Sequence, residues 1–436
     1  MTISVIIPAY NAAGALGACL EALAASSVRP HECIVVDDGS TDETAAIARR
    51  HGATVIRTER NRGAPHARNL GAASATGDVL LFIDADVCVH PDTLERIRRR
   101  FDEDLTLDAV FGCYDDAPHE PDFLSQYRNL MHCYVHRRGK SEASTFWTGC
   151  GAVRRRVFEA CGGFDPTLPS MDDVEFGYRL RRSGRRILLD REIQVQHRKR
   201  WRFWNMAKTD LLLRGVPWVE IIWRHRFLPD DLNVGPAQRA SLAAALLFLA
   251  AAAVVVGTDP ARTATAFAAF FFALLAPFWA GLFGSRTGAL GAAPFGALVA
   301  AGAWSLEMPW VAGTTAVVFL AWALLRRPHG RAARAALLGA VSAAGVSAAA
   351  AAFAVVSPPA AAVAAALLIC LVALNSGFYR FLAFHRGWLF AAAALPFQLL
   401  YCLSNAVSLV LGTLRYFTRP ARPQPAVLAQ RQGSGD

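Results

Sequence analysis

Acidic residues almost disappear from the second half of this chain. After Asp231 the only acids are Asp259, Glu307 and Asp436, while long runs of Ala, Leu, Val and Phe take over. About 20 apolar residues are enough for one helix to cross the hydrocarbon core of a bilayer. The sequence therefore predicts a soluble first half and a second half of membrane-spanning helices.

Seven stretches of the second half have the composition of membrane spans: residues 240–257, 264–284, 288–305, 309–325, 335–356, 360–379 and 388–411. Two of them, 288–305 and 309–325, are short and rich in Ala and Gly, which leaves open whether one is re-entrant. We expect six or seven spans in an all-α transmembrane domain at residues 239–414. A short, Pro-rich tail at residues 415–436 is expected to be disordered.

Basic residues set the expected orientation of these spans. Lys and Arg in short loops normally stay on the cytosolic side, and the net charge of +10 fits a surface that faces anionic lipid. We expect the inner (cytoplasmic) membrane, with the N-terminal domain in the cytosol. Seven spans would place Arg415, Arg419 and Arg422 outside, so an even number, or a turn back at Pro396, would fit the bias better.

Residues 197–227 interleave Arg and Lys with Trp, Phe, Leu and Ile. Such composition occurs in nucleic-acid-binding segments, but directly before membrane spans it is typical of helices that lie among lipid headgroups. We predict basic amphipathic juxtamembrane helices at residues 196–238, a lipid bilayer as partner, and no nucleic-acid partner. Nine singly spaced cysteines fit a reducing compartment and argue against structural zinc.

Strand-like and helix-like stretches alternate in the first half at the spacing of βαβ units. Apolar runs at residues 4–9, 33–36, 53–57 and 79–83 predict strands, and residues 12–25, 40–50 and 64–75 predict helices. Ser40 and Glu43 have the spacing of a capping box, which places a helix start at Ser40. The pattern predicts an α/β domain with a doubly wound, Rossmann-like parallel sheet.

Polar residues follow three of these strands where each one ends: Pro8 to Asn11, Asp37 with Asp38, and Asp84 with Asp86. Because ligands of open parallel sheets bind at the carboxyl ends of the strands, these groups predict one nucleotide crevice that also holds a metal ion. The sequence has no G-x-G-x-x-G turn and no P-loop, which disfavours a dinucleotide cofactor and a P-loop nucleotide site.

Five ordered motifs then point to a family. Residues 1–230 contain SVIIPAYN, VVDDGSTDET, NRGAPHARNLGAASATGDVLLFIDAD, TGCGAVRR with GGFDP, and MDDVEFGYRLRRSG. In this order they resemble the motifs of family 2 glycosyltransferases with the GT-A fold. The resemblance implies a GT-A catalytic domain, with a mostly parallel sheet, that binds a nucleotide sugar at residues 1–195.

The resemblance also implies roles for individual residues. It assigns the metal, Mg²⁺ or Mn²⁺ on the donor diphosphate, to Asp86 and Asp84, and the general base to Asp173, with the role of Asp172 open. A helix N-cap is the alternative role for this acidic pair. Other implied substrate-binding residues are Pro8, Ala9, Tyr10, Asp37 and Asp38 for the nucleoside, Trp147 and Gly149 near the sugar and acceptor, and His197, Arg200 and Trp201 near the diphosphate.

Residues 123–135 place aromatic and aliphatic side chains at helical spacing. Two interpretations stay open for this helix: it packs inside the domain, or it lies at the membrane interface and guides a lipid acceptor.

The function expected from these features is an inverting, metal-dependent glycosyltransferase. It would move a sugar from a UDP- or GDP-sugar to a membrane lipid at the cytosolic face, either a polyprenyl phosphate or a hydroxyl lipid. One alternative is a processive polysaccharide synthase, although the Gln-x-x-Arg-Trp motif of those enzymes has one residue too many here, at Gln196 to Trp201. The other is a non-catalytic membrane scaffold or transporter with a degenerate sugar-nucleotide domain.

Overall fold

The computed structural model describes residues 1–168, 170–229, 232–258 and 358–418. Its contacts divide the chain into two compact units. The first comprises Met1–Gly235 together with the chain from Ser408 onward, and the second comprises Pro236–Val407. The domain boundary predicted at residue 195 falls inside a strand, Ile187–His197.

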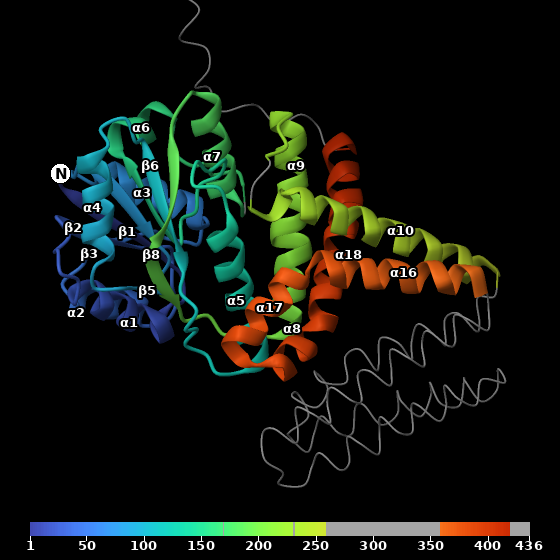
Figure 1. The fold of residues 1–436 in the computed structure, drawn as a ribbon. Helices are drawn as coiled ribbons and strands as arrows, with labels where there is room; N and C mark the ends of the chain where they lie inside the picture. Colours follow the sequence, from blue (N-terminus) through green and yellow to red (C-terminus); the bar gives the residue numbers. More distant parts are fainter. Residues whose placement is uncertain (169, 230–231, 259–357, 419–436) are drawn as a thin grey trace, which may run out of the picture. The chain divides into compact units, whose positions relative to one another are not determined.

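An eight-stranded sheet forms the core of the first unit, in the order β3-β2-β1-β4-β7-β6-β8-β5. Helices between the strands lie against this sheet (Figure 1). The strands are β1 Ile3–Ala9, β2 Glu32–Asp37, β3 Thr54–Arg57, β4 Val79–Ile83, β5 Val87–Val89, β6 Ala109–Tyr114, β7 Cys150–Arg154 and β8 Ile187–His197. The helices that follow or join them are α1 Ala13–Ala24, α2 Thr44–Arg50, α3 Ala64–Ser74, α4 Thr93–Glu103, α5 Phe123–Arg138, α6 Arg155–Ala160 and α7 Asp172–Arg182.

The predicted α/β domain is confirmed, and its first four strands are parallel as expected. β1 pairs with β2 and β4, and β2 pairs with β3, all parallel. Beyond β4 the sheet is mixed: β7 runs antiparallel to β4 and β6, β8 runs parallel to β6, and β5 runs antiparallel to β8. β4 is buried at all five positions, as the continuous apolar run Val79–Ile83 predicts.

The helix start predicted at Ser40 is wrong, because α2 begins at Thr44. Ser40 instead ties two loops together: its backbone N–H donates to Asp37 Oδ1 (3.0 Å), and its hydroxyl accepts from the Asn11 N–H (2.9 Å). The carboxylate of Asp42 accepts from the Thr44 N–H at the helix start (3.0 Å). Ser40 thus organises the loops at the strand ends and does not cap α2.

Aromatic rings fix the start of α7 against the end of β4. Phe164, from the loop before α7, lies 5.0 Å from the ring of Phe82 on β4 and 5.0 Å from that of Phe176 on α7. Phe158 contacts all three rings. Each such pair adds about 0.5–1.5 kcal/mol beyond the area it buries, so α7 is held firmly over the sheet edge where β4 ends.

A continuous helical stretch follows β8 and belongs to the first unit. It consists of α8 Phe203–Lys208, a π-helical segment Thr209–Gly215 that we call the π segment, and α9 Val216–His225. A short 3₁₀ turn, Leu232–Val234, follows α9 further along the chain. Helices therefore occur within the range 196–238, and their juxtamembrane position stays a prediction.

The second unit is helical over its described residues. α10 Pro236–Thr258 packs beside α16 Pro358–Leu374 (Figure 1). α17 Ser376–Arg386 and the part of α18 Trp388–Thr418 up to Val407 complete the unit. Asn375 joins these helices: its side-chain N–H donates to Ser241 Oγ (3.1 Å), and its Oδ1 accepts from Gln398 (3.0 Å).

The prediction of six or seven spans is supported only in small part. In the ranges that the structure describes, α18 alone is long and apolar enough to cross a membrane, and a second candidate exists only if residues 366–374 and α17 count as one broken span. The chain bends by 59° between those two pieces, so the span predicted at 360–379 is not straight. α18 runs through Pro396 without turning back and includes residues 415–418, which were predicted to be disordered. The predictions for 264–284, 288–305, 309–325, 335–356 and 419–436 lie outside the described residues.

We predict that Gly177→Ala destabilises the protein, because a Cβ at residue 177 of α7 would collide with the backbone of Thr145 and Phe146. Overpacking of this kind costs about 1–3 kcal/mol. Gly14→Ala is the matched control, since a Cβ at residue 14 of α1 meets nothing within 4 Å. The midpoint of thermal unfolding of the full-length protein should fall for Gly177→Ala and stay level or rise for Gly14→Ala. Equal midpoints would contradict the packing of α7.

Candidate active site

Two carboxylates open α7. Asp172 and Asp173 are its first two residues, and the N-cap position belongs to Met171. Asp173 accepts from the N–H of Val174 (2.8 Å), and from the N–H and hydroxyl of Thr148 at longer distances (3.3 and 3.4 Å). The alternative role of the pair as a helix cap is therefore wrong, although both charges stand at the favourable end of the helix dipole.

Arg68 on α3 joins this pair to the end of β4. Its guanidinium donates to Asp172 Oδ2 (2.7 Å) and to Asp84 Oδ1 (2.9 Å), and its side chain is only 7% exposed. Sequence reasoning missed Arg68 as a site residue. The signal was available, since an arginine on the buried face of a helix must find a paired carboxylate.

Burial changes the acidity of both carboxyls of α7. Burial raises the pKa of Asp172 to about 6, and the charge of Asp173 adds to the rise while Arg68 opposes it. Burial also raises the pKa of Asp173, against the opposing charge of Arg68 and the hydrogen bonds from Thr148 and Val174. A carboxylate whose pKa is raised toward neutrality is better suited to accept a proton than an ordinary aspartate.

Asp86 lies beside His197 at the end of β8. Asp86 Oδ2 is 3.6 Å from His197 Nε2, and His197 Nδ1 is 2.6 Å from Asn129 Oδ1. Asn129 Oδ1 also accepts from Trp201 Nε1–H (3.3 Å), which fixes the orientation of the amide. Nδ1 of His197 therefore carries the proton, and in the neutral ring the Nε2 lone pair faces a carboxylate.

Two lone pairs this close are stabilised by a cation or a proton between them, so Asp86 and His197 fit a metal ion. When Nε2 of His197 carries a proton, the hydrogen bond and charge of the imidazolium outweigh the burial of Asp86 and lower its pKa; a metal ion between the two groups would take the place of that proton. Asp84 is the poorer ligand because it is paired with Arg68. Within the described ranges, no three His, Cys, Asp or Glu side chains form a metal cluster. Mg²⁺ and similar ions are usually held by one or two protein ligands plus substrate phosphates, so a two-residue site suffices.

The predicted nucleoside residues lie at the ends of β1 and β2. Asp38 Oδ2 accepts from the N–H groups of Arg62 (2.9 Å) and Gly63 (2.7 Å), and its Oδ1 accepts from Thr58 (2.9 Å). Asp37 is fully buried and forms an ion pair with Arg57 (3.2 Å). Asp38 thus shapes the loop that opens α3, while Asp37 holds the loop after β2 and pairs with β3. Of the other predicted residues Ala9 is buried, Pro8 is half-buried and Tyr10 is half exposed.

The loop before β7 brings a tryptophan to the same region. The ring of Trp147 lies 4.8 Å from that of Tyr114, in an edge-to-face arrangement. A Cβ on Gly149 would overlap the Trp147 ring, so this glycine is required by the close approach. Tyr114 in turn stacks on His197 with ring centroids 4.3 Å apart. Tyr114, which sequence reasoning missed, thus connects Trp147 to the Asp86–His197 pair.

Trp201 reaches the Asp86–His197 pair only through Asn129, and Arg200 lies near other acids. Trp201 is 4% exposed; its N–H donates to Ser125 Oγ (2.7 Å), and its ring packs under Lys199. The Arg200 guanidinium is 65% exposed and lies near Asp122 (3.8 Å) and Glu120. Of the three residues predicted near the diphosphate, only His197 faces Asp86, because β8 ends there and the next residues turn away along α5.

α5 is a packed helix, as one of the two interpretations held, and most of its residues are buried. It contacts the π segment at two places, which are one helical turn apart. Arg128 forms a buried ion pair with Asp210, and His132 Nε2 accepts from Arg214 (2.7 Å). Burial lowers the pKa of His132 well below its usual value, and Arg214 adds to the shift, so the ring is neutral and able to accept. The π segment therefore places the Arg214 guanidinium beside the His132 ring, which faces Tyr114.

We predict that Arg68→Met destabilises the protein in a pH-dependent way. Without the guanidinium, the folded-state pKa of Asp172 rises further above 6, so a buried carboxyl must hold a proton or leave a charge unpaired. Breaking such a buried pair costs about 3–5 kcal/mol. Because protonation relieves the penalty, the loss in unfolding midpoint should be larger at pH 8 than at pH 5. Arg99→Met, which breaks an exposed pair with Glu103 on α4, is the control and should cost about 1 kcal/mol or less at either pH. An Arg68→Met loss that is the same at both pH values would rule out this account.

Comparison with known proteins identifies the domain. Residues 4–162 match the family Glycosyl transferase family 2. An uncharacterized glycosyltransferase of Haemophilus influenzae is 29% identical over 187 residues, which are 40% of this chain and 60% of the relative. A PGL/p-HBAD biosynthesis glycosyltransferase of Mycobacterium bovis is 37% identical over 115 residues, 25% of this chain and 45% of the relative.

Among solved structures, residues 1–349 of S. aureus TarS align with a TM-score of 0.40 and 20% identity, over 52% of this chain and 64% of that one. The chain thus spans less than two thirds of the length of each of these relatives. The family match itself covers β1 to α6, which includes Asp38, Arg68, Asp84 and Asp86. Residues 4–162 of this chain therefore match glycosyl transferase family 2, and the rest of the chain lies outside that match.

Proposed function

We propose that this protein is an inverting glycosyltransferase that takes a sugar from a UDP- or GDP-sugar. The observation that carries the proposal is the grouping of Asp84 and Asp172 on one buried arginine, with Asp173 next in sequence. A non-catalytic domain has no need for two adjacent carboxyls with raised pKa values at the start of α7, because their desolvation reduces stability. The family of residues 4–162 supports the same conclusion.

The spacing of the strands suits a nucleoside diphosphate. Asp38 follows β2 and Asp84 follows β4, and β1 lies between these two strands. Neighbouring strands are about 4.8 Å apart, so the two strand ends are separated by about 10 Å. A nucleoside over the end of β2, beside half-exposed Tyr10, would direct its diphosphate toward Asp86.

Asp86 and His197 are the residues that would hold Mg²⁺ or Mn²⁺. When bound, the ion supplies positive charge to the diphosphate that leaves the sugar. The chain's own part is to keep both ligands in place: Asn129 fixes the His197 tautomer, and Tyr114 stacks on the ring. Neighbours that orient metal ligands in this way commonly change metal affinity 10- to 100-fold.

Asp173 is the proposed general base. As the acceptor oxygen bonds to the anomeric carbon, the bond from that carbon to the diphosphate oxygen breaks, and Asp173 takes the acceptor's proton. One displacement inverts the configuration, so no second carboxylate nucleophile is needed. Asp172, held by Arg68, keeps the first turn of α7 in place beside the end of β4. An acceptor that is already a phosphate anion would not need the base.

We further propose a membrane lipid acceptor and a location at the inner membrane with residues 1–235 in the cytosol. α18 has the length and composition of a span. The helical stretch from Phe203 to His225 exposes part of Trp204, Leu212 and Trp223, and the chain also exposes Arg202 and Lys208 there. Exposed aromatic and aliphatic side chains beside basic ones favour a headgroup surface. A lipid acceptor held there would enter the site next to Arg214, which reaches His132 from the same stretch.

We predict that Asp173→Asn removes sugar transfer to lipid. General-base loss lowers rates by about 10²- to 10⁴-fold, while binding of the nucleotide, which lies toward β1 and β2, should stay within twofold of the wild type. Mass spectrometry of lipids from cells that make wild type, Asp173→Asn or the exposed control Asp102→Asn should show one added sugar in the first and third only. Long polymers would instead indicate a synthase. A folded Asp173→Asn protein that still transfers at the wild-type rate would disprove the base assignment.

We also predict that a divalent ion tightens nucleotide binding through Asp86. Calorimetric titration of wild type with UDP or GDP should give at least about tenfold tighter binding with Mn²⁺ or Mg²⁺ than with a chelator. Asp86→Asn and His197→Gln should each lose most of that difference, and Asp102→Asn should keep it. Equal affinity with and without the ion in wild type would contradict the metal site.

A further inference from the structure

Met171, immediately before the catalytic pair, has a backbone conformation that its side chain disfavours. Its φ is 62° and its ψ is 21°, in the left-handed region, and it forms the N-cap position of α7. Non-glycine residues hold this conformation only where the surrounding structure fixes it. The direction in which Asp172 and Asp173 leave the loop therefore depends on whatever holds Met171.

α9 provides that support. Ile221 is fully buried and packs in one cluster with Met171, Val174 and Tyr178, against which Trp218 also lies. Trp218 Nε1–H donates to the hydroxyl of Tyr178 (3.1 Å). One face of α9 thus covers Met171 and the first two turns of α7.

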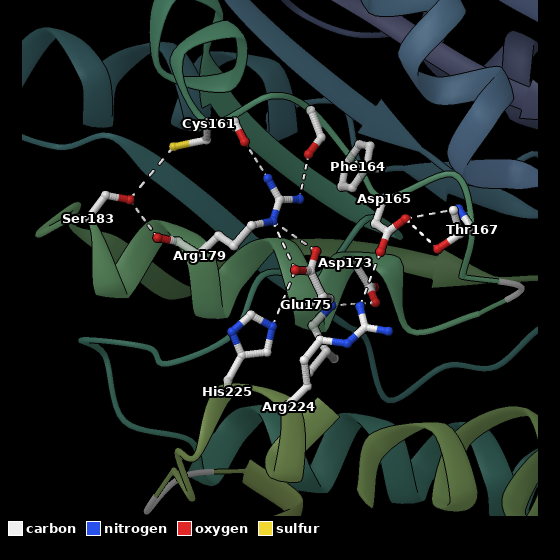
Figure 2. Close-up of polar contacts among 12 residues, drawn as sticks. Cys161, Phe164, Asp165, Thr167, Asp173, Glu175, Arg179, Ser183, Arg224 and His225 are labelled. Atoms are coloured by element: carbon white, nitrogen blue, oxygen red, sulfur yellow. Dashed lines mark hydrogen bonds and ion pairs between the residues drawn. The ribbon is translucent and has the colours of Figure 1, made fainter. Parts of the chain in front are cut away.

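Two polar contacts at the end of α9 reinforce the packing, and Figure 2 shows both. The Arg224 guanidinium lies 3.2 Å from Asp165 in the loop before α7, and His225 Nε2 lies 3.3 Å from Glu175 Oε1 on α7. Glu175 is 1% exposed, and its other contact is Arg179, which also donates to carbonyls of the same loop. The loop and the helix that flank the catalytic pair are therefore both tied to α9.

The opposite face of α9 contacts the end of α18. Glu220 forms an ion pair with Arg415 (2.8 Å), and Trp223 Nε1–H donates to Thr413 Oγ1 (3.0 Å). A Cβ on Gly412 would collide with Val219, so the helices approach closely there. α9 accordingly lies between the helix of the catalytic pair and the last turns of the candidate membrane helix.

We propose that α9 is a positioning element for catalysis: Ile221 holds Met171 in its left-handed conformation, and Arg224 and His225 secure the flanking loop and helix. This inference rests on the proposed role of Asp173 as the base. Nucleotide binding at β1 and β2 should not depend on α9. In the sheet, β1 and β2 lie on one side of β4, and β7, whose preceding loop contacts Asp173 through Thr148, lies on the other.

The test compares Ile221→Ala with Ile222→Ala in the full chain. Ile222 is the half-buried neighbour of the same type on α9, outside the cluster with Met171. We expect Ile221→Ala to lower kcat about ten- to a hundredfold, the effect of a small displacement of a reacting group, with nucleotide affinity unchanged. Ile222→Ala should stay within threefold of wild type. An equal loss of kcat in both variants, or a parallel loss of nucleotide affinity, would overturn the proposal.

A rescue variant separates positioning from general destabilisation. Glycine adopts the left-handed conformation without strain, so Met171→Gly should lessen the kcat loss caused by Ile221→Ala to fivefold or less. No rescue would overturn the role assigned to Met171.

Hydrogen exchange gives a readout that does not require activity. In Ile221→Ala, the amides of residues 172–175 should exchange at least tenfold faster than in wild type, while those of β1 and β2 stay protected. Unchanged exchange at the start of α7 would overturn the proposal, even if Asp173 were not the base. Failure of the base assignment alone would appear as an active Asp173→Asn protein with the exchange difference still present.

Discussion

A buried guanidinium holds this site together. Arg68 lies on α3, yet it pairs with Asp84 at the end of β4 and with Asp172 at the start of α7. Without a cation between them, buried Asp172 would bear a large desolvation penalty and the half-buried Asp84 a smaller one. With it, the acids converge on one sheet edge while Asp173 stays open to accept a proton. The sheet places Asp84 at the end of β4, and the two ion pairs of Arg68 hold the start of α7 close to it.

Much of the N-terminal α/β domain could be predicted, because buried parallel strands consist of continuous apolar runs. β1, β2 and β4 and their crossover helices begin and end within a few residues of the expected positions, apart from the start of α2. The direction of β7 could not be predicted, because an apolar run carries no information about which neighbour it will pair with. The same limit applies to Ser40, whose hydroxyl serves Asn11 on another loop and not its own helix.

At the candidate site, the sequence predicted the acidic residues but not the residues that contact them. Motif order pointed to Asp86 and Asp173, but Arg68, Tyr114 and Arg214 matter through contacts made across the fold. Local composition could not separate these residues from ordinary core or surface positions. Trp201, predicted near the diphosphate, is buried against α5 and contacts His197 only through Asn129, a relation that the sequence does not reveal.

The first compact unit is discontinuous in sequence, and that has a consequence for biogenesis. Trp223 meets Thr413 across 190 residues, so the second unit must be synthesised before α9 acquires its outer neighbour. A chain emerging from the ribosome can fold its sheet early, as domains generally do. It cannot finish the surroundings of α9 until nearly all of the polypeptide has been made, so maturation of the first unit is tied to completion of the helical half of the chain.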